Sequence, residues 1–282
     1  PPADRSATLG VVSRIHVDLT GPPQTMLATL YAKALDAEAE HPVLADRWAV
    51  TAVSRIDYDW ARTGVRPRSA PGVAMRSAHF DRSTRDFLDA HDRAVVVHLG
   101  CGLDARVFRI DPGPDVEWFD VDHPAVIALR AQVYPARAHC TAVPASVTSP
   151  DWLEALPADC PALVLGEGLT MYLTEADGQA LLRRAVSHFP SGELQFDAFS
   201  RLGIRLQKAN VVVRRSGSTL HWPIETAADI VGAVPGVRPL VVESVFDAHD
   251  FAEYGLGYRL LIEVMSKIPA LHTISTYHRY AF

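Results

Sequence analysis

Cysteine is scarce in this sequence: three occur among 282 residues, at Cys101, Cys140 and Cys160. An odd set without C-x-x-C spacing indicates neither a disulfide framework nor a zinc site. A chain of this length also buries enough apolar surface to fold without disulfides. We therefore expect free thiols, no bound metal, and the reducing cytoplasm as the setting.

Clustered positive charge and long apolar runs are also lacking. The chain carries 27 Lys and Arg against 33 Asp and Glu, a net charge of −6, and its arginines are scattered. Binding to nucleic-acid phosphates needs clustered Lys and Arg. No apolar run approaches the ~20 residues of a membrane-spanning helix, and the polar start Pro1–Arg5 does not resemble a signal peptide. We expect neither a nucleic-acid partner nor a membrane partner.

Residues 1–92 are predicted to be helical. Within Gln24–Glu40 the apolar residues fall on one helical face. Further helices are expected over Leu44–Ile56 and Val73–His91, with Gly64–Gly72 as a connecting loop. No strand signal occurs in this part, so we interpret residues 1–92 as a helical N-terminal cap.

From residue 93 onwards, short apolar runs alternate with helical stretches. Strands are expected over Ala94–Leu99, Val116–Val121, His139–Val143, Ala162–Leu165 and Glu193–Ser200, and helices over Leu103–Phe108, Pro124–Val133, Asp151–Leu156 and Glu175–Phe189. This alternation predicts βαβ units and a parallel sheet with right-handed crossovers, a Rossmann-like α/β domain over residues 93–282.

The C-terminal part has a different pattern. Leu240–Phe246, Tyr258–Met265 and Thr276–Phe282 are strand-like, and the last of them alternates with a period of two. An antiparallel hairpin that closes the sheet edge is the simplest interpretation. Arg201–Ser218 is basic and irregular, and we expect an insertion near residues 201–222.

A glycine turn, Gly100-Cys101-Gly102, follows the first strand and opens a helix, where a doubly wound sheet binds its ligand. Glycine there permits a sharp turn and a close ligand. The spacing also fits G-x-G-x-x-A, so a nicotinamide dinucleotide must be weighed. Asp104, just inside the turn, would repel a pyrophosphate but attract the ammonium and sulfonium groups of S-adenosylmethionine. The charge favours the methyl donor.

Three acids at strand ends are candidate ligand-binding residues. An acid about 20 residues beyond the turn typically holds ribose hydroxyls, and both Asp120 and Asp122 qualify. Whichever of the two does not bind the ribose would cap the helix that begins near Pro124. Glu167, flanked by glycines after a buried strand, is costly to bury unless it is paired. We expect it to face the ligand, and the alternative is a salt bridge with an arginine.

Three segments in this order and spacing, His98–Arg106, Trp118–Pro124 and Gly166–Leu173, resemble the leucine carboxyl methyltransferase family. Within that family they look closest to the bacterial polyketide O-methyltransferases of the tetracenomycin type. The resemblance runs from about Val73 through the last strand. It implies a class I methyltransferase with a mostly parallel seven-stranded sheet, S-adenosylmethionine as cofactor and S-adenosylhomocysteine as product.

The resemblance also implies roles for single residues. It implies Arg76 on the cofactor carboxylate, Gly100, Cys101, Gly102 and Asp104 at the turn, Asp122 rather than Asp120 on the ribose, Glu167 near the amino-acid end, and Ser146-Val147 at the adenine. Ser146 departs from the Asp that the family often has at this position, but its hydroxyl can still bond the adenine amine. Lys33 is similar in position to a family lysine.

The expected acceptor is a small, aromatic, anionic molecule of the polyketide type, methylated at a carboxylate or a phenolic oxygen. An ionised carboxylate needs no general base, whereas a phenol would benefit from one. Candidates for the base are His79, His98, Asp197 and His221, and Tyr172 is a candidate for orienting the acceptor. His79 and Tyr172 are the two that we single out as candidate catalytic residues.

The N-terminal part and the insertion cover the pocket in the family. Arg201 and Arg205 are candidates for holding an acceptor carboxylate. Candidate aromatic lining residues are Tyr58, Trp60, Trp222, Phe246 and Tyr254. Two other functions stay open: a nicotinamide-dependent oxidoreductase, and a non-catalytic ligand-binding protein that has kept the fold.

Overall fold

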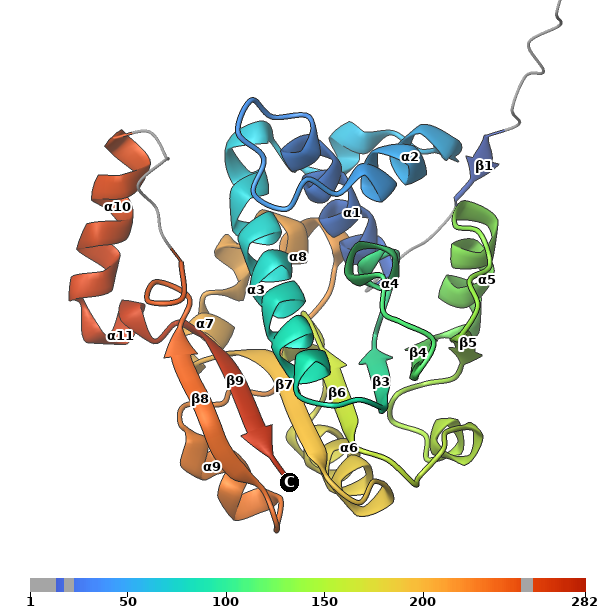
Figure 1. The fold of residues 1–282 in the computed structure, drawn as a ribbon. Coiled ribbons are helices and arrows are strands. Elements are labelled where there is room, and N and C mark those ends of the chain that lie inside the picture. The colour runs from blue at the N-terminus through green and yellow to red at the C-terminus, as the bar shows by residue number, and fades with distance from the viewer. Residues whose placement is uncertain (1–13, 18–22, 250–255) are drawn as a thin grey trace, which may run out of the picture.

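A seven-stranded sheet forms the centre of the molecule in the computed structural model, which describes residues 14–17, 23–249 and 256–282. Helices cover both faces of the sheet, and α1, α2 and α8 lie beyond the ends to which β3 and β6 point (Figure 1). The strand order is β5-β4-β3-β6-β7-β9-β8, and a separate two-stranded sheet pairs β1 with β2.

The central sheet is parallel except at one strand. Its strands are β3 (Ala94–Leu99), β4 (Val116–Asp122), β5 (Cys140–Pro144), β6 (Ala162–Gly166), β7 (Gly192–Phe199), β8 (Arg238–Ser244) and β9 (Ser275–Ala281). Strands β3 to β7 pair in parallel, and β9 is antiparallel to both of its neighbours, β7 and β8. Every residue of β3 and β6 is buried, because helices cover both faces of this part of the sheet. The α/β fold with a mostly parallel seven-stranded sheet is therefore confirmed.

The helices mostly follow the predicted ranges. They are α1 (Pro23–Ala37), α2 (Arg47–Arg55), α3 (Ala70–Asp89), α4 (Arg106–Ile110), α5 (Pro124–Val133), α6 (Glu175–His188), α7 (Arg201–Arg205), α8 (Val211–Ser216), α9 (Ala227–Ala233), α10 (Leu256–Lys267) and α11 (Pro269–His272). Short 3₁₀ turns are η1 (Trp60–Thr63), η2 (Pro67–Ser69), η3 (Asp151–Ala155), η4 (Thr170–Tyr172) and η5 (Gln207–Ala209). Within the described ranges, no helix combines the length and apolar character needed to cross a bilayer.

The strand predicted over Tyr258–Met265 is wrong, because this segment lies in α10. Leu260 and Val264 are four positions apart, and Ile268 follows Val264 by four more positions. This spacing is helical. Strands β8 and β9 still form the predicted antiparallel pair at the sheet edge. Their connection runs through α10 and α11 instead of through a third strand.

Five smaller predictions also differ from the structure. The N-terminal part contains β1 (Ile15–His16) and β2 (Ile56–Asp57), each too short to produce a periodic signal. The loop expected over Gly64–Gly72 contains η2 and the start of α3, where Pro71 is tolerated in the first turn. The irregular stretch Arg201–Ser218 contains α7, η5 and α8. The helix expected over Asp151–Leu156 is the 3₁₀ turn η3, and the one expected from Leu103 begins at Arg106.

The division after residue 92 stays a prediction. Phe80 and Phe87 of α3 belong to the same apolar core cluster as Val96 and Trp118 of the sheet. Helix α3 therefore joins the N-terminal part closely to the sheet, and its residues also reach the cavity described below.

Gly178 of α6 packs directly against a tryptophan side chain. A Cβ at this position would lie 2.0 Å from the indole of buried Trp222. We expect Gly178→Ala to lower the free energy of unfolding by about 1–3 kcal/mol, the usual cost of overpacking. Urea unfolding followed by circular dichroism measures this. Gly232→Ala in α9 is the control, since nothing lies within 4 Å of its added Cβ, and a loss of stability in both variants would contradict the packing argument.

Candidate active site

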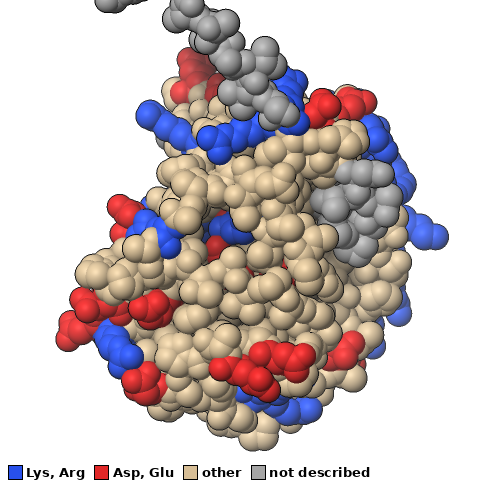
Figure 2. All heavy atoms as spheres, turned by 90° about the vertical axis from the view of Figure 1, so that its right-hand side faces the viewer, with Lys and Arg blue, Asp and Glu red and all other residues tan. Residues whose placement is uncertain are grey.

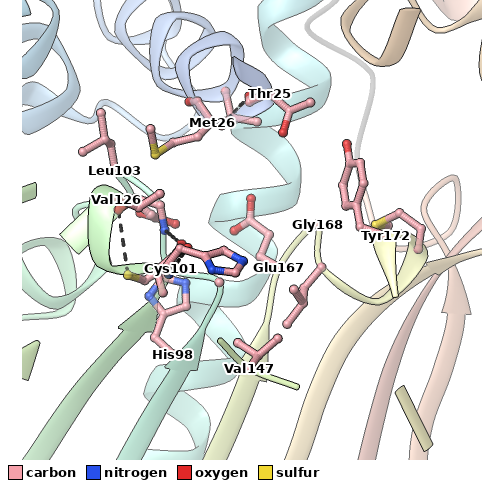
Figure 3. Close-up of a pocket in the computed structure, with 18 of the residues that line it drawn as sticks. Thr25, Met26, His98, Cys101, Leu103, Val126, Val147, Glu167, Gly168 and Tyr172 are labelled. Atoms are coloured by element: carbon pink, nitrogen blue, oxygen red, sulfur yellow. Dashed lines mark hydrogen bonds between the residues drawn. The ribbon is translucent and has the colours of Figure 1, made fainter. Parts of the chain in front are cut away.

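A cavity of about 410 Å³ opens at the carboxyl ends of β3, β4, β5 and β6. This is the edge at which doubly wound sheets bind ligands. Figure 3 shows Met26 and Thr25 of α1 above the cavity, Glu167 in its middle, and Tyr172 on the side away from His98 and Cys101. Seen from the side, the molecule has a hollow with charged side chains in its depth (Figure 2).

The glycine turn forms one wall of this cavity. Gly100 and Gly102 have φ values of +62° and +53°, in the left-handed region that favours glycine. A Cβ on Gly102 would lie 3.0 Å from Met26 in the roof. The turn is therefore a place where backbone and ligand can approach without an intervening side chain. Cys101, between the two glycines, also lines the cavity, and burial keeps the pKa of its thiol well above the usual value.

Asp122 is held beside this turn by two backbone donors. Its carboxylate accepts hydrogen bonds from the N–H of Gly102 at 2.8 Å and from the N–H of His123 at 2.7 Å. Burial raises the pKa of Asp122, and these two N–H groups oppose that rise. Asp122 lines the cavity, with its carboxylate fixed at the junction of β4 and the turn.

Asp120 has a different environment, although it lies on the same strand. It is 2% exposed and does not line the cavity. Its carboxylate accepts hydrogen bonds from Arg130 at 2.6 Å and from the indole of Trp118 at 3.0 Å. Burial would raise the pKa of Asp120, but Arg130 holds it at about 2. Asp120 is therefore part of a buried ion pair, and Asp122 is the acid available to a ligand.

Ser146 and Val147 follow β5 and line the cavity next to the turn. The Ser146 hydroxyl forms a hydrogen bond of 2.8 Å with the Thr148 hydroxyl and accepts one from the Thr148 N–H. Val147 is buried and offers an apolar surface. This part of the cavity suits a flat, uncharged group.

Glu167 is buried in the middle of the cavity and surrounded by cations. Its carboxylate accepts hydrogen bonds from Arg76 Nε at 3.0 Å, from the Ser77 hydroxyl at 2.8 Å and from Arg106 Nη2. Lys33 Nζ lies 3.9 Å away. Burial would raise the pKa of Glu167, but these three cations hold it far below the usual value. Both sequence interpretations of Glu167 therefore apply, since it lines the cavity and is also paired with arginines.

Asp104 extends the same network. Its carboxylate lies 2.9 Å from Lys33 Nζ, 2.8 Å from Arg109 Nη1 and 3.4 Å from Arg106 Nη2. From the sequence, Asp104 was expected to be an unpaired carboxylate that would repel pyrophosphate. The structure shows that three cations compensate its charge, so any selection by charge belongs to the network as a whole.

The buried network contains one carboxylate more than it has cations. Its cations are Lys33, Arg76, Arg106 and Arg109, and its carboxylates are Asp46, Asp81, Asp104, Glu167 and Asp197. With all nine groups ionised, one negative charge is in excess. Such a network favours a ligand with a net positive charge, because an uncompensated buried charge is costly.

Arg76 lies between two of these acids. Its Nη1 is 3.3 Å from Asp197 Oδ2, and Asp197 Oδ1 accepts a hydrogen bond of 2.6 Å from the Gly168 N–H. The Arg76 side chain is 22% exposed and lines the cavity. Asp197 thus orients Arg76 and the backbone after Glu167, which gives it a positioning role instead of the role of a base.

The two candidate catalytic residues lie in different places. His79 does not line the cavity: it stacks on Tyr277 at 4.0 Å, and burial lowers its pKa to about 3. The geometry therefore does not support His79 as a base for a ligand in this cavity. Tyr172 lines the cavity and forms a hydrogen bond with Thr25 across it, and burial raises the pKa of its phenol.

Two other histidines do not serve as bases here. His98 is at the floor, with Nε2 at 3.2 Å from Arg106 Nη1 and Nδ1 at 3.4 Å from Asp120. It is a buried residue held by its neighbours. His221 is exposed and outside the lining residues.

The other predicted lining residues lie elsewhere. Tyr58, Trp60, Trp222 and Phe246 do not line the cavity, and Tyr254 lies outside the described residues. Arg201 and Arg205 do not line it either, and Arg201 Nε lies 3.7 Å from Glu225.

Sequence reasoning missed the half of the cavity that lies beyond Glu167. Apart from Tyr172, its lining residues were not predicted: they are Thr25, Thr29, Leu30, Met171, Phe199, Asn210, Val212 and Val213. Met26, in the roof beside Gly102, was missed as well. The signal available in the sequence was the spacing of Thr25 and Thr29, which puts two small polar residues on one face of α1. The α8 residues carry no comparable signal.

The chain is similar to known proteins over most of its length. Residues 23–186 match the family model described as leucine carboxyl methyltransferase. The chain is 41% identical over 266 residues to the tetracenomycin polyketide synthesis O-methyltransferase TcmP of Streptomyces glaucescens, covering 94% of this chain and 98% of that one. It is 34% identical over 260 residues to the S-adenosyl-L-methionine-dependent methyltransferase dpfgK of Gibberella zeae, covering 85% and 87%.

Among solved structures, a putative methyltransferase from Thermobifida fusca has a TM-score of 0.57 at 14% identity, covering 88% of this chain and 93% of that one. This likeness supports the fold alone.

Proposed function

The chain belongs to the leucine carboxyl methyltransferase family, and we propose that its cavity binds S-adenosylmethionine and that it methylates an oxygen of a small, anionic, aromatic acceptor of the polyketide type. We further propose that this oxygen belongs to a carboxylate. The observation that carries the second proposal is the absence of a carboxylate or imidazole among the described residues that line the half of the cavity beyond Glu167.

The residues on the same side of the cavity as the glycine turn, which we call its inner half, suit the cofactor. Asp122 would hold the ribose, and Ser146 and Val147 would flank the adenine. Arg76 would pair with the cofactor carboxylate, and Glu167 would attract its cationic groups. S-adenosylmethionine carries a net charge of +1 and supplies an electrophilic methyl group, and the buried network has one negative charge in excess. The charges of ligand and site therefore match.

The residues that line the half of the cavity beyond Glu167, its outer half, can hold an acceptor but cannot take its proton. A carboxylate is ionised at neutral pH, whereas a phenol with a pKa near 10 keeps its proton. The hydroxyls of Tyr172 and Thr25 can donate hydrogen bonds to an anionic oxygen, and apolar walls from Met171, Phe199 and Val213 exclude water. Holding the acceptor oxygen in line with the methyl group is then the main contribution of the protein.

Matched acceptors test this proposal. A panel of polycyclic aromatic acids, each paired with the phenol on the same ring system, is incubated with the enzyme and S-adenosylmethionine, and products are identified by mass spectrometry. We expect methyl esters from the acids and no aryl ethers from the phenols. For an acid, kcat/KM should stay constant from about pH 6 to 9, because the carboxylate is ionised throughout.

A different result would contradict the carboxylate proposal. Methylation of phenols alone, with kcat/KM rising about tenfold per pH unit, would show that a phenolate is the acceptor. Binding of S-adenosylhomocysteine without transfer to any acid or phenol would instead favour a non-catalytic ligand-binding protein.

A further inference from the structure

A second concave surface lies between α2, α3 and α4, with a volume of about 460 Å³. We call it the arginine groove, and its lining residues are Val43, Leu44, Ala45, Arg47, Trp48, Ala78, Asp81, Arg82, Arg85 and Arg109. It is separate from the cofactor cavity. The nine positions from Arg76 to Arg85 make two and a half turns of α3, so these two side chains leave opposite sides of the helix.

Positive charge is concentrated in this groove. Four arginines line it, against the single acid Asp81. Arg109 is already paired, with Asp81 at 2.7 Å and Asp46 at 2.6 Å. The remaining three, Arg47, Arg82 and Arg85, are therefore in excess, in a chain whose net charge is −6.

These three guanidinium groups are available to a ligand. The side chains of Arg47 and Arg82 form no hydrogen bond or ion pair with another residue in the part of the chain that the structure describes, and all three arginines are exposed. Arg85 donates a hydrogen bond of 3.0 Å to the main-chain oxygen of Arg109. Guanidinium groups bind oxyanions with two parallel hydrogen bonds, and several of them around one concave surface select for more than one negative charge.

The walls of the groove are rigid. The carboxylate of buried Asp36 accepts hydrogen bonds from three successive N–H groups, those of Val43, Leu44 and Ala45, at 3.0, 2.9 and 3.1 Å. Helix α2 begins at Arg47, and the Asp46 carboxylate caps it by accepting a hydrogen bond from the Ala49 N–H at 3.1 Å. The Arg109 side chain at the floor is only 7% exposed, and three carboxylates fix it. A binding site that is already formed requires little reorganisation.

We propose that the arginine groove binds an oxyanion with two or more negative charges, of the kind presented by a diphosphate or a phosphate ester. Neither the methyl donor nor a monocarboxylate acceptor has this charge, so the groove would serve a second ligand. The ligand is held mainly by Arg82 and Arg85 of α3 and by Arg47 at the start of α2. Arg109 belongs to the buried network and is not suitable for substitution as a test.

The probe is inorganic pyrophosphate, titrated by calorimetry into the full chain at constant ionic strength. The test variant is Arg82→Ala with Arg85→Ala, and the control variant is Arg68→Ala with Arg238→Ala. The control makes the same charge change at two exposed arginines outside the groove. We expect one saturable site, with a dissociation constant at least tenfold higher in the test variant and changed less than twofold in the control. Unchanged affinity of the test variant for S-adenosylhomocysteine shows that it is folded.

Three results would overturn the proposal. The first is no saturable binding to the wild type, and the second is equal weakening in both variants, which would indicate screening by net charge. The third is loss of pyrophosphate binding when S-adenosylhomocysteine saturates the protein, which would place the anion in the first cavity. A parallel titration with adenosine diphosphate identifies the source: tighter binding than pyrophosphate indicates a nucleotide, and equal binding indicates the diphosphate group alone.

Discussion

Glu167→Ala is expected to weaken the binding of S-adenosylhomocysteine by two to three orders of magnitude. The substitution removes the carboxylate that faces the cavity and accepts hydrogen bonds from Arg76 and Arg106. Arg76 then keeps only Asp197 as a buried partner, and Arg106 keeps Asp81 and Asp104. A loss of this size corresponds to about 3–4 kcal/mol of binding free energy, since each tenfold change in affinity is about 1.4 kcal/mol. The excess of negative charge in the network also disappears, and with it the attraction for the cationic groups of the cofactor.

Calorimetric titration with S-adenosylhomocysteine measures the effect, and Glu193→Ala is the matched control. Glu193 pairs with Arg279 at 3.0 Å near the start of β7, at the opposite end of the sheet from the cavity. Removing it makes the same charge change without touching the site, so cofactor affinity should stay within twofold of the wild type. Unchanged affinity of a folded Glu167→Ala protein would remove Glu167 from the cofactor site.

Arg106→Met is expected to cause the largest loss of stability. The Arg106 side chain is fully buried and touches Asp81 at 2.7 Å, Asp104 at 3.4 Å and Glu167. Methionine fills much of the volume but leaves these carboxylates with less positive charge, which should cost about 3–5 kcal/mol. Because proteins of this kind are stable by only about 5–15 kcal/mol, a marked fall in the urea midpoint is expected.

Arg93→Met is the control for this measurement. Arg93 pairs with Asp159 at 2.9 Å, but the two side chains are 57% and 63% exposed. An exposed pair is worth about 0–1 kcal/mol, so the urea midpoint should change little. Equal effects of the two substitutions would show that burial of the network does not contribute as we argue.

The pH dependence of the Arg106 effect has a definite sign. Burial would raise the pKa values of Asp81 and Asp104, but the surrounding arginines hold both below the usual value. A carboxylate with a lowered pKa in the folded state stabilises the protein above its unfolded pKa, near 4, and this contribution is lost as the pH falls through the folded value. Part of it depends on Arg106, so the stability difference between wild type and Arg106→Met should be full at pH 7 and shrink below about pH 4.

The parts of this protein that could be predicted from sequence are those determined locally. A strand buried on both faces is a continuous apolar run, so β3 and β6 were visible, and the glycine turn followed β3 directly. Because parallel strands place their carboxyl ends at one edge, the turn, Asp122 and Glu167 were expected at one site, and all three line the cavity. The helical spacing within α10 was also present but was outweighed by its apolar composition.

The parts that could not be predicted depend on contacts between distant residues. Arg106 and Arg109 are ordinary arginines in the sequence, and their partner Asp81 lies 25 and 28 positions away. The position of the two acids on one side of β4 left Asp120 and Asp122 as alternatives, and only the family resemblance favoured Asp122. The presence of Arg130, which packs against Asp120 only in the folded chain, separates them. The same holds for His79, which stacks on Tyr277 nearly 200 positions later.

A crystal structure of the protein with S-adenosylhomocysteine tests the central claim most directly. We predict that the ligand occupies the first cavity, with its ribose hydroxyls hydrogen-bonded to the Asp122 carboxylate and its amino-acid end beside Glu167 and Arg76. Open space should then remain beside Tyr172 for the acceptor. A ligand whose ribose lies away from Asp122, or whose amino-acid end points away from Glu167, would contradict the account.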